Sequence, residues 1–240
     1  MSEGAGGTSA TEGRPLLSVL MPVYNEERTL RRVVEAVRAV DISKEIILVD
    51  DGSQDGSPAL IDELASLPGV SVYHHPRNMG KGAAVRTAIS HARGDLVLIQ
   101  DADLEYDPND YPLLLEPITT GKAEVVFGSR AFTSHSAYSF WFVMGNKLVT
   151  LATNILFDCY ISDMETCYKV MRREIAEGLN LRSRGFEIEP EITAKLVRSG
   201  HRIYEVSISY AARSREEGKK LTWTDGLKAL RTLLYYRFNQ

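Results

Sequence analysis

Three acidic side chains follow an apolar run in the middle of this chain, and their spacing suits a metal ion. The run 96–100 leads directly into Asp101, Asp103 and Glu105. Carboxylates gathered at one strand end repel one another unless a cation lies between them. Oxygen ligands of this kind suit Mg²⁺ or Mn²⁺, and such ions usually also hold phosphates. The segment therefore predicts a metal-bound diphosphate, although turn chemistry alone would also favour Asp here.

Two further segments carry groups that suit phosphate. Gly80 and Lys81 open a predicted helix, where glycine permits close backbone approach and the helix N-terminus favours anions. The spacing is not that of a Walker A loop. Arg213 and Lys219 belong to a mixed-charge loop, which is either simply solvated or a lid that closes over the diphosphate.

The first half of the chain alternates strand-like and helical segments. The predicted strands are residues 17–21, 45–49, 70–74, 95–99 and 123–127, and the predicted helices are 28–40, 57–67, 81–92 and 111–119. This alternation predicts an α/β fold with a mostly parallel sheet flanked by helices. Ligands bind such sheets beyond the carboxyl ends of the strands. Four polar loops lie there, at residues 24–26, 50–51, 78–81 and 101–103.

The second half predicts a C-terminal helical annex of the same domain. Its expected elements are helices at 140–157, 187–199 and 224–238 and a strand at 202–208. We expect a disordered leader at 1–14 and one domain at 15–240. The apolar side chains of the last helix predict core packing, and the alternative is an interfacial helix whose basic residues face anionic headgroups. The apolar set is Leu227, Leu230, Leu233, Leu234, Tyr235, Tyr236 and Phe238, and the basic set is Lys228, Arg231 and Arg237.

Bulk composition narrows the class of protein. The chain has 240 residues, 44% of them apolar, and a net charge of -4, which is ordinary for a globular protein and argues against nucleic-acid binding. No signal peptide is visible, and no apolar run reaches the roughly 20 residues of a membrane span. The expected location is cytoplasmic, with peripheral contact at the inner face of the membrane left open. A homodimer and a membrane-subunit partner are also left open.

The ordered motifs resemble those of a family-2 glycosyltransferase with the GT-A fold, over roughly residues 16–236. The matching segments are Pro22–Glu26, Val49–Ser53, Asn78–Gly82 and Gln100–Leu104. Three later segments resemble the dolichyl-phosphate mannose synthase branch and its bacterial polyprenyl-phosphate relatives, namely Gly128–Arg130, Ser162–Thr166 and Arg213–Lys219. The chain departs from that branch at Glu105, where Gln is often found, and we expect no C-terminal transmembrane hairpin such as some relatives have.

The resemblance implies a role for each matching residue. The nucleotide base and ribose would be held by Pro22, Tyr24, Glu26 and Asp51. Gly80 and Lys81 would lie beside the nucleotide, and Asp101 and Asp103 would form the DxD element that binds the metal and the donor diphosphate. Arg130 and Arg213 would meet phosphate groups of donor or acceptor.

The function predicted from these residues is inverting, metal-dependent transfer of a hexose from GDP-mannose or UDP-glucose to a polyprenyl or dolichyl phosphate. Asp163 would orient the acceptor or the sugar, or merely cap a helix. One alternative is transfer to a soluble hydroxyl, which needs Asp163, Glu165 or Glu189 as a general base. The other is a non-catalytic subunit that binds the nucleotide sugar.

Overall fold

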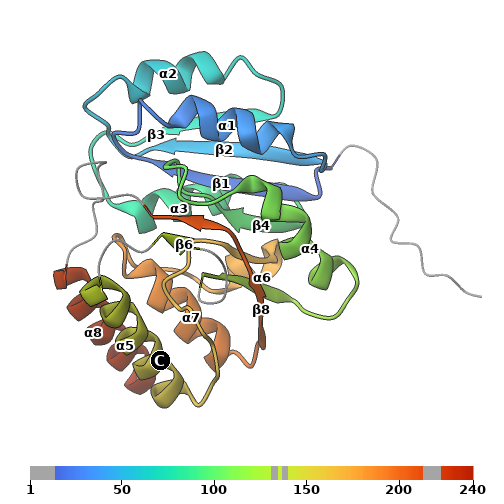
Figure 1. The fold of residues 1–240 in the computed structure, drawn as a ribbon. Helices are drawn as coiled ribbons and strands as arrows, with labels where there is room; N and C mark the ends of the chain where they lie inside the picture. Colours follow the sequence, from blue (N-terminus) through green and yellow to red (C-terminus); the bar gives the residue numbers. More distant parts are fainter. Residues whose placement is uncertain (1–13, 131–134, 137–139, 213–222, 240) are drawn as a thin grey trace, which may run out of the picture.

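A seven-stranded sheet forms the centre of the molecule in the computed structural model, which describes residues 14–130, 135–136, 140–212 and 223–239 (Figure 1). The strand order is β3-β2-β1-β4-β7-β5-β8. The strands are β1 (Leu17–Val23), β2 (Lys44–Asp50), β3 (Val70–His74), β4 (Leu96–Ile99), β5 (Val125–Ser129), β7 (Lys169–Arg172) and β8 (Ile203–Ser207). A separate two-stranded sheet pairs β6 (His135–Ser136) with β9 (Tyr210–Ala211).

Strand β7 alone runs against the direction of its neighbours in the large sheet. It pairs antiparallel with β4 through Leu98 and Val170, and antiparallel with β5 through Val126 and Val170. The other pairs of this sheet are parallel. The amino end of β7 therefore lies at the edge where the parallel strands have their carboxyl ends.

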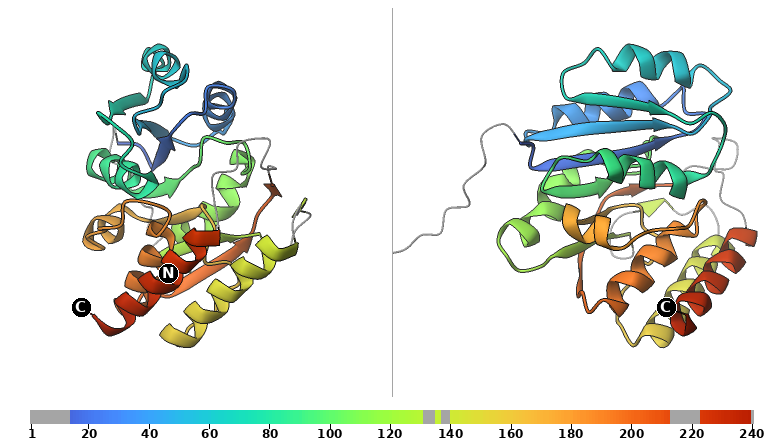
Figure 2. Two further views of the ribbon diagram at one scale, coloured as in Figure 1. Left: turned by 90° about the vertical axis from the view of Figure 1, so that its left-hand side faces the viewer. Right: turned by 180° about the vertical axis from the view of Figure 1, so that it is seen from behind.

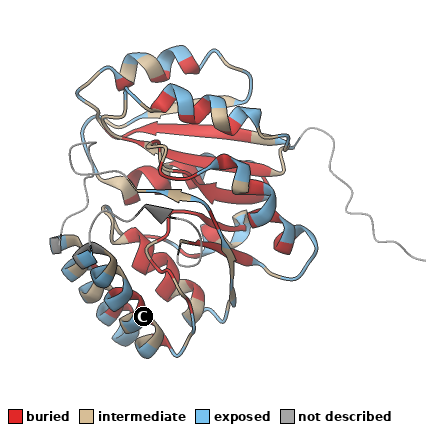
Figure 3. Ribbon diagram, viewed as in Figure 1, coloured by how far each residue is buried: buried red, intermediate tan, exposed pale blue. Residues whose placement is uncertain are grey.

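Helices cover the sheet and complete its core. They are α1 (Leu30–Ala39), α2 (Ser57–Leu64), α3 (Lys81–His91), α4 (Tyr111–Thr119), α6 (Arg173–Gly178) and α7 (Ile188–Arg198), with a 3₁₀ turn at Pro108–Asp110. Helix α1 buries Leu30, Val33, Val34 and Val37, whose three- and four-residue spacing places them on one face. Strands β1, β2 and β4 are almost fully buried (Figure 3), as expected for parallel strands covered on both faces.

The helical annex has a small apolar core of its own. Helices α5 (Phe140–Phe157) and α8 (Trp223–Phe238) lie side by side at the end of the molecule away from α1 and α2 (Figure 2). Between them and α7 is a buried cluster of Val149, Phe157, Ile161, Met164, Ala194, Ala229, Leu233 and Tyr236.

The fold class predicted from the sequence is confirmed, and several elements differ from the prediction. Strand β1 continues through Pro22 to Val23 instead of ending before the proline. Strand β7 and helix α6 were not expected, because short segments with charged ends carry little periodicity. The core-packing prediction for α8 holds for Leu233 and Tyr236 but is wrong for four others, which are exposed: Leu227, Leu234, Tyr235 and Phe238. The predicted leader lies outside the described residues except for Arg14.

Candidate active site

A cavity of about 340 Å³ opens at the carboxyl ends of the parallel strands. The loops that follow β1, β2, β3, β4 and β5 all contribute to its lining, as the predicted topology requires. Ten predicted site residues line it: Pro22, Tyr24, Glu26, Asp51, Gly80, Lys81, Asp101, Asp103, Glu105 and Arg130. Asp163 does not line it, and Arg213 and Lys219 lie outside the described residues.

The Asp51 carboxylate holds the loop that leads into helix α3. It accepts hydrogen bonds from the backbone N–H groups of Met79 (2.9 Å) and Gly80 (2.7 Å), and it lies 2.7 Å from Nδ1 of His75. Gly80 has a φ of 95°, a conformation that favours glycine. A Cβ at this position would also collide with the carbonyl oxygen of Arg184. Asp51 thus positions the loop of Met79 and Gly80, and its predicted contact with a base or ribose stays a prediction.

The loop after β4 carries the two aspartates in a constrained backbone. The Oδ1 atom of Asp103 accepts a hydrogen bond from the backbone N–H of Glu105 at 3.1 Å, while Leu104 between them has a φ of 62°. A left-handed conformation is costly for a residue with a Cβ and persists where the surroundings enforce it. Thr29 helps to fix the loop by donating to the carbonyl oxygen of Ala102 at 2.7 Å. The loop is therefore held in shape by its contacts with α1 and the core.

Lys81 joins the aspartate loop to the second half of the chain. Its Nζ lies 2.8 Å from Oδ1 of Asp101 and 3.1 Å from Oε1 of Glu189. The other oxygen of Glu189 lies 2.5 Å from Nζ of Lys169, which is fully buried. Burial alone lowers the pKa of Lys81, but Asp101 and Glu189 outweigh it and hold that pKa well above its ordinary value. Lys81 is therefore a fixed positive charge at the cavity wall.

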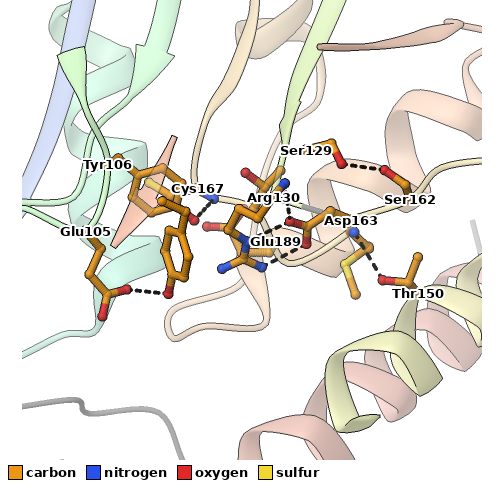
Figure 4. A network of polar contacts seen from close by, with 12 residues as sticks. Glu105, Tyr106, Ser129, Arg130, Thr150, Ser162, Asp163, Cys167 and Glu189 are labelled. Atoms are coloured by element: carbon orange, nitrogen blue, oxygen red, sulfur yellow. Dashed lines mark hydrogen bonds and ion pairs between the residues drawn. The ribbon is translucent and has the colours of Figure 1, made fainter. Parts of the chain in front are cut away.

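Arg130 is the second fixed cation of the cavity, and Asp163 holds it there. The guanidinium pairs with both carboxylate oxygens, Nε to Oδ2 at 2.6 Å and Nη2 to Oδ1 at 2.8 Å (Figure 4). Burial raises the pKa of Asp163, but the charge and hydrogen bonds of Arg130 prevail and lower it. Asp163 is buried beside the arginine and fixes its guanidinium, and the predicted catalytic role of Asp163 stays a prediction.

The side chain of Glu105 contacts a tyrosine on the other side of the same arginine. Its Oε2 accepts a hydrogen bond from the Tyr210 hydroxyl at 2.7 Å, and the Tyr210 ring centroid lies 4.9 Å from Cζ of Arg130. A guanidinium at this distance from an aromatic ring is stabilised by the ring. Over the described residues, no three His, Cys, Asp or Glu side chains form a group that could hold a metal. The metal site predicted from Asp101, Asp103 and Glu105 stays a prediction, with all three residues in the cavity lining.

Several lining residues were not predicted as the core of the site, namely Asn146, Glu165, Cys167, Phe186, Glu189 and Tyr210. Glu165 and Glu189 were named only as alternative bases. The antiparallel β7 explains Glu165 and Cys167, since the segment before this strand must lie at the cavity edge. Burial, followed by the nearby charge of Glu189, raises the pKa of Glu165 to about 7. Only the tertiary contact between α7 and this segment could have revealed that shift.

The oxygen donors present fit a hard divalent cation. Asp101 and Asp103 both line the cavity and present carboxylates, the ligands that Mg²⁺ and Mn²⁺ prefer. With two protein carboxylates, further ligands would come from a bound diphosphate or water, as is usual for Mg²⁺.

The fold and this cavity define a glycosyltransferase, and the chain belongs to glycosyl transferase family 2. The model of that family matches residues 18–179. An undecaprenyl-phosphate 4-deoxy-4-formamido-L-arabinose transferase of Aeromonas hydrophila is 32% identical over 228 residues, which cover 92% of this chain and 66% of that protein. The low-salt glycan biosynthesis hexosyltransferase Agl6 of Haloferax volcanii is 30% identical over 92% of this chain and 53% of its own length. The chain thus spans about half to two thirds of these relatives.

Solved structures share the fold at lower identity. The glucosyl-3-phosphoglycerate synthase of Mycobacterium tuberculosis with phosphoglyceric acid matches with a TM-score of 0.70 and 22% identity, covering 93% of this chain and 80% of that one. The same enzyme with Mn²⁺, UDP and glucosyl-3-phosphoglycerate matches with a TM-score of 0.67 and 22% identity over the same shares. At this identity the likeness shows the architecture alone.

Proposed function

We propose that this protein transfers a hexose from a nucleoside diphosphate sugar to a polyprenyl phosphate, with inversion at the sugar carbon. The observation that carries the proposal is one cavity that combines the carboxylates of Asp101 and Asp103 with two fixed cations, Lys81 and Arg130. The carboxylates suit a metal-bound diphosphate, and the cations suit the meeting of two phosphates. The named relatives that act on undecaprenyl phosphate support the same acceptor class.

In the proposed reaction, an acceptor phosphate oxygen forms the new bond to C1 of the sugar. The bond from C1 to the donor diphosphate breaks on the opposite face. A phosphate monoester is already anionic at neutral pH, with a second pKa of about 6, so the acceptor needs no general base. Arg130 would screen the charges of the two phosphates as they approach, and Asp163 would keep the guanidinium oriented.

Asp101 and Asp103 would hold a divalent metal, Mg²⁺ or Mn²⁺. The structural neighbours were solved with Mn²⁺ or Mg²⁺ and UDP, which supports this assignment. A bound metal would neutralise charge on the leaving diphosphate. Lys81, which contacts Asp101 at 2.8 Å, would lie beside the same diphosphate and add a second positive charge.

The first test is transfer of label from radioactive UDP-glucose and GDP-mannose, supplied separately, to a short polyprenyl phosphate in detergent. Each reaction is run with Mg²⁺, with Mn²⁺ and with chelator. Label that moves into the organic phase only with metal supports the proposal and identifies the sugar. Metal-dependent cleavage of the donor without a lipid product would contradict the acceptor assignment.

A second candidate function follows from Glu165. A carboxyl group with a pKa of about 7 in the cavity is suited to accept a proton from an attacking hydroxyl. A soluble hydroxyl acceptor would therefore require Glu165, whereas a phosphate acceptor would not. Glu165→Gln separates the two: transfer to the polyprenyl phosphate persists under the first proposal, and transfer to any hydroxyl acceptor is lost under the second.

A further inference from the structure

Helix α5 presents an apolar stripe to the outside of the molecule. Its exposed apolar residues are Phe140, Met144, Leu148, Leu151 and Ile155. Their spacings of four, four, three and four residues place them on one face of the helix along nearly its whole length. Four are more than half exposed: Phe140 at 68%, Leu148 at 59%, Leu151 at 54% and Ile155 at 72%. The opposite face, with Val149, packs into the annex core, so the helix is apolar on both sides.

Helix α8 extends the same kind of surface beside α5. Its exposed apolar residues Leu227, Leu234, Tyr235 and Phe238 also share one face, and Phe238 is 77% exposed. The two helices pack against each other and lie side by side in all the views (Figures 1 and 2). We call these nine residues together the α5–α8 face. A contiguous apolar surface of this kind marks an interaction site on a soluble domain.

Basic side chains accompany the α5–α8 face. Lys147 lies on α5, and Lys228, Arg231 and Arg237 lie on α8, all of them exposed. Helix α5 contains no acidic residue, and the one acidic residue of α8, Asp225, pairs with Lys228 at 2.9 Å. The face is thus locally positive on a chain whose net charge is -4. Long basic side chains beside apolar ones are typical of helices that lie in the headgroup region of a membrane.

The α5–α8 face lies on the reverse of a wall of the cavity. Asn146 lies two residues from both Met144 and Leu148, which places it on the inner side of α5, where it lines the cavity. Thr150 on the same inner side accepts a hydrogen bond from the backbone N–H of Met164, beside Glu165 and Asp163. One helix therefore separates the reaction space from the apolar surface. If the α5–α8 face lay on a membrane, the cavity would be close to a lipid-linked acceptor in that membrane.

We infer that the α5–α8 face docks on the surface of a bilayer that contains anionic lipids. The inference deepens the proposed function, since its purpose rests on a lipid-linked acceptor. Four basic side chains are complementary to anionic headgroups, which attract such residues near a membrane surface. A two-fold dimer through this face would instead bring the same basic residues toward one another. Charge therefore favours the membrane over a second copy of the chain.

The test is sedimentation of the full chain with phosphatidylcholine vesicles, with and without phosphatidylglycerol, in the absence of donor and acceptor. The double variant Leu148→Glu/Ile155→Glu should bind vesicles at least about tenfold more weakly, because two apolar anchors are replaced by charges. The double variant Arg231→Glu/Arg237→Glu should lose the preference for anionic vesicles. The control is Leu113→Glu, an exposed leucine on α4, which should bind as the unaltered protein does.

Circular dichroism and size-exclusion chromatography show whether each variant folds and which oligomer it forms. Vesicle binding that the Leu148→Glu/Ile155→Glu protein retains in full would overturn the inference. Failure of the unaltered protein to bind vesicles would also overturn the inference, whether that protein is a monomer or a dimer that Ile155→Glu dissociates. Transfer in detergent reports on the proposed function alone. Sugar transfer without vesicle binding would thus contradict only the inferred docking surface. Vesicle binding without sugar transfer would contradict only the proposed function.

Discussion

The two halves of the molecule build their share of the cavity in different ways. In the first half, the carboxyl ends of consecutive parallel strands and the segments that follow them supply Pro22, Tyr24, Asp51, Lys81 and Asp101. These loops are shaped largely by backbone hydrogen bonds within the half, such as those from Met79 and Gly80 to Asp51. Their chemistry can be recognised from short motifs because each motif fixes its own local geometry.

In the second half, pairs of charged side chains from distant segments place the functional groups. Arg130 follows β5 but is oriented by Asp163, and Glu189 on α7 contacts both Lys81 and Lys169. Removing one partner of such a buried pair leaves an uncompensated charge, which is more costly than losing a surface contact. Substitutions in the first half of the site should therefore mainly reduce the rate of the reaction. Substitutions in the second half should mainly reduce the stability of the fold or misorient the functional groups.

The largest expected effect is on the chemistry of the first half. Asp103→Asn should reduce transfer by about a thousandfold, because a neutral amide is a poor ligand for a metal that stabilises the leaving diphosphate. The fold should survive, since the amide oxygen can still accept the hydrogen bond from the backbone N–H of Glu105. The measurement is kcat for transfer of labelled sugar with saturating Mg²⁺.

The matched control for that change is Asp107→Asn in the same loop region. Asp107 accepts hydrogen bonds from Asn109 and does not line the cavity. Equal losses in the two variants would contradict the metal assignment of Asp103, because the loss would then reflect the loop and not the site.

The next effect is on the stability of the second half. Glu189→Gln should lower the free energy of unfolding by about 3 kcal/mol, because buried Lys169 and nearly buried Lys81 lose the negative charge that they share. Glu63→Gln removes one partner of the exposed Arg31–Glu63 pair and should cost less than about 1 kcal/mol. Urea unfolding of both variants measures the difference. Equal losses of unfolding free energy would contradict the view that ion pairs of the second half matter more for stability than exposed pairs.

A third prediction concerns the orientation of the Arg130 guanidinium when its own charge is kept. Asp163→Asn should reduce transfer by about a hundredfold while the KM for the donor changes little, since the guanidinium of Arg130 stays charged but loses its bidentate partner. Arg130→Lys should show a similar loss, because an ammonium cannot reproduce the fork geometry. Steady-state kinetics with each substrate varied in turn separates kcat from KM. An unchanged kcat in Asp163→Asn would show that Arg130 needs no positioning.

The smallest effect is a pH dependence of stability. Burial and Glu189 raise the pKa of Glu165 from 4.5 in the unfolded chain to about 7 in the folded protein. The folded state then binds the proton more tightly, so the stability that this group contributes is present below pH 4.5 and is lost as pH rises through 7.

Glu165→Gln mimics the protonated form at every pH. Relative to this variant, the unaltered protein should lose about 2 kcal/mol of unfolding free energy between pH 5 and pH 8. Urea midpoints of both proteins across that range provide the measurement. Parallel curves would mean that the carboxyl group is ionised normally in the cavity.

The sequence by itself determined the fold class and the polar loops of the first half that line the cavity. Alternating apolar strands and helices leave few ways to bury both faces of a sheet, and parallel connections bring the polar loops to one edge. The sequence also held the motifs of family 2, so Asp101, Asp103 and Arg130 could be named before any contact was known.

The tertiary structure alone decided three other features. The antiparallel β7 brought Glu165 and Cys167 to the cavity edge, because strand direction depends on pairing and not on composition. Ion pairs between residues far apart in the chain turned Asp163 into a partner of Arg130 and Glu189 into a partner of two lysines. The packing of α5 and α8 left an apolar face outside, since a helix that is apolar on both sides does not reveal which side the core will cover.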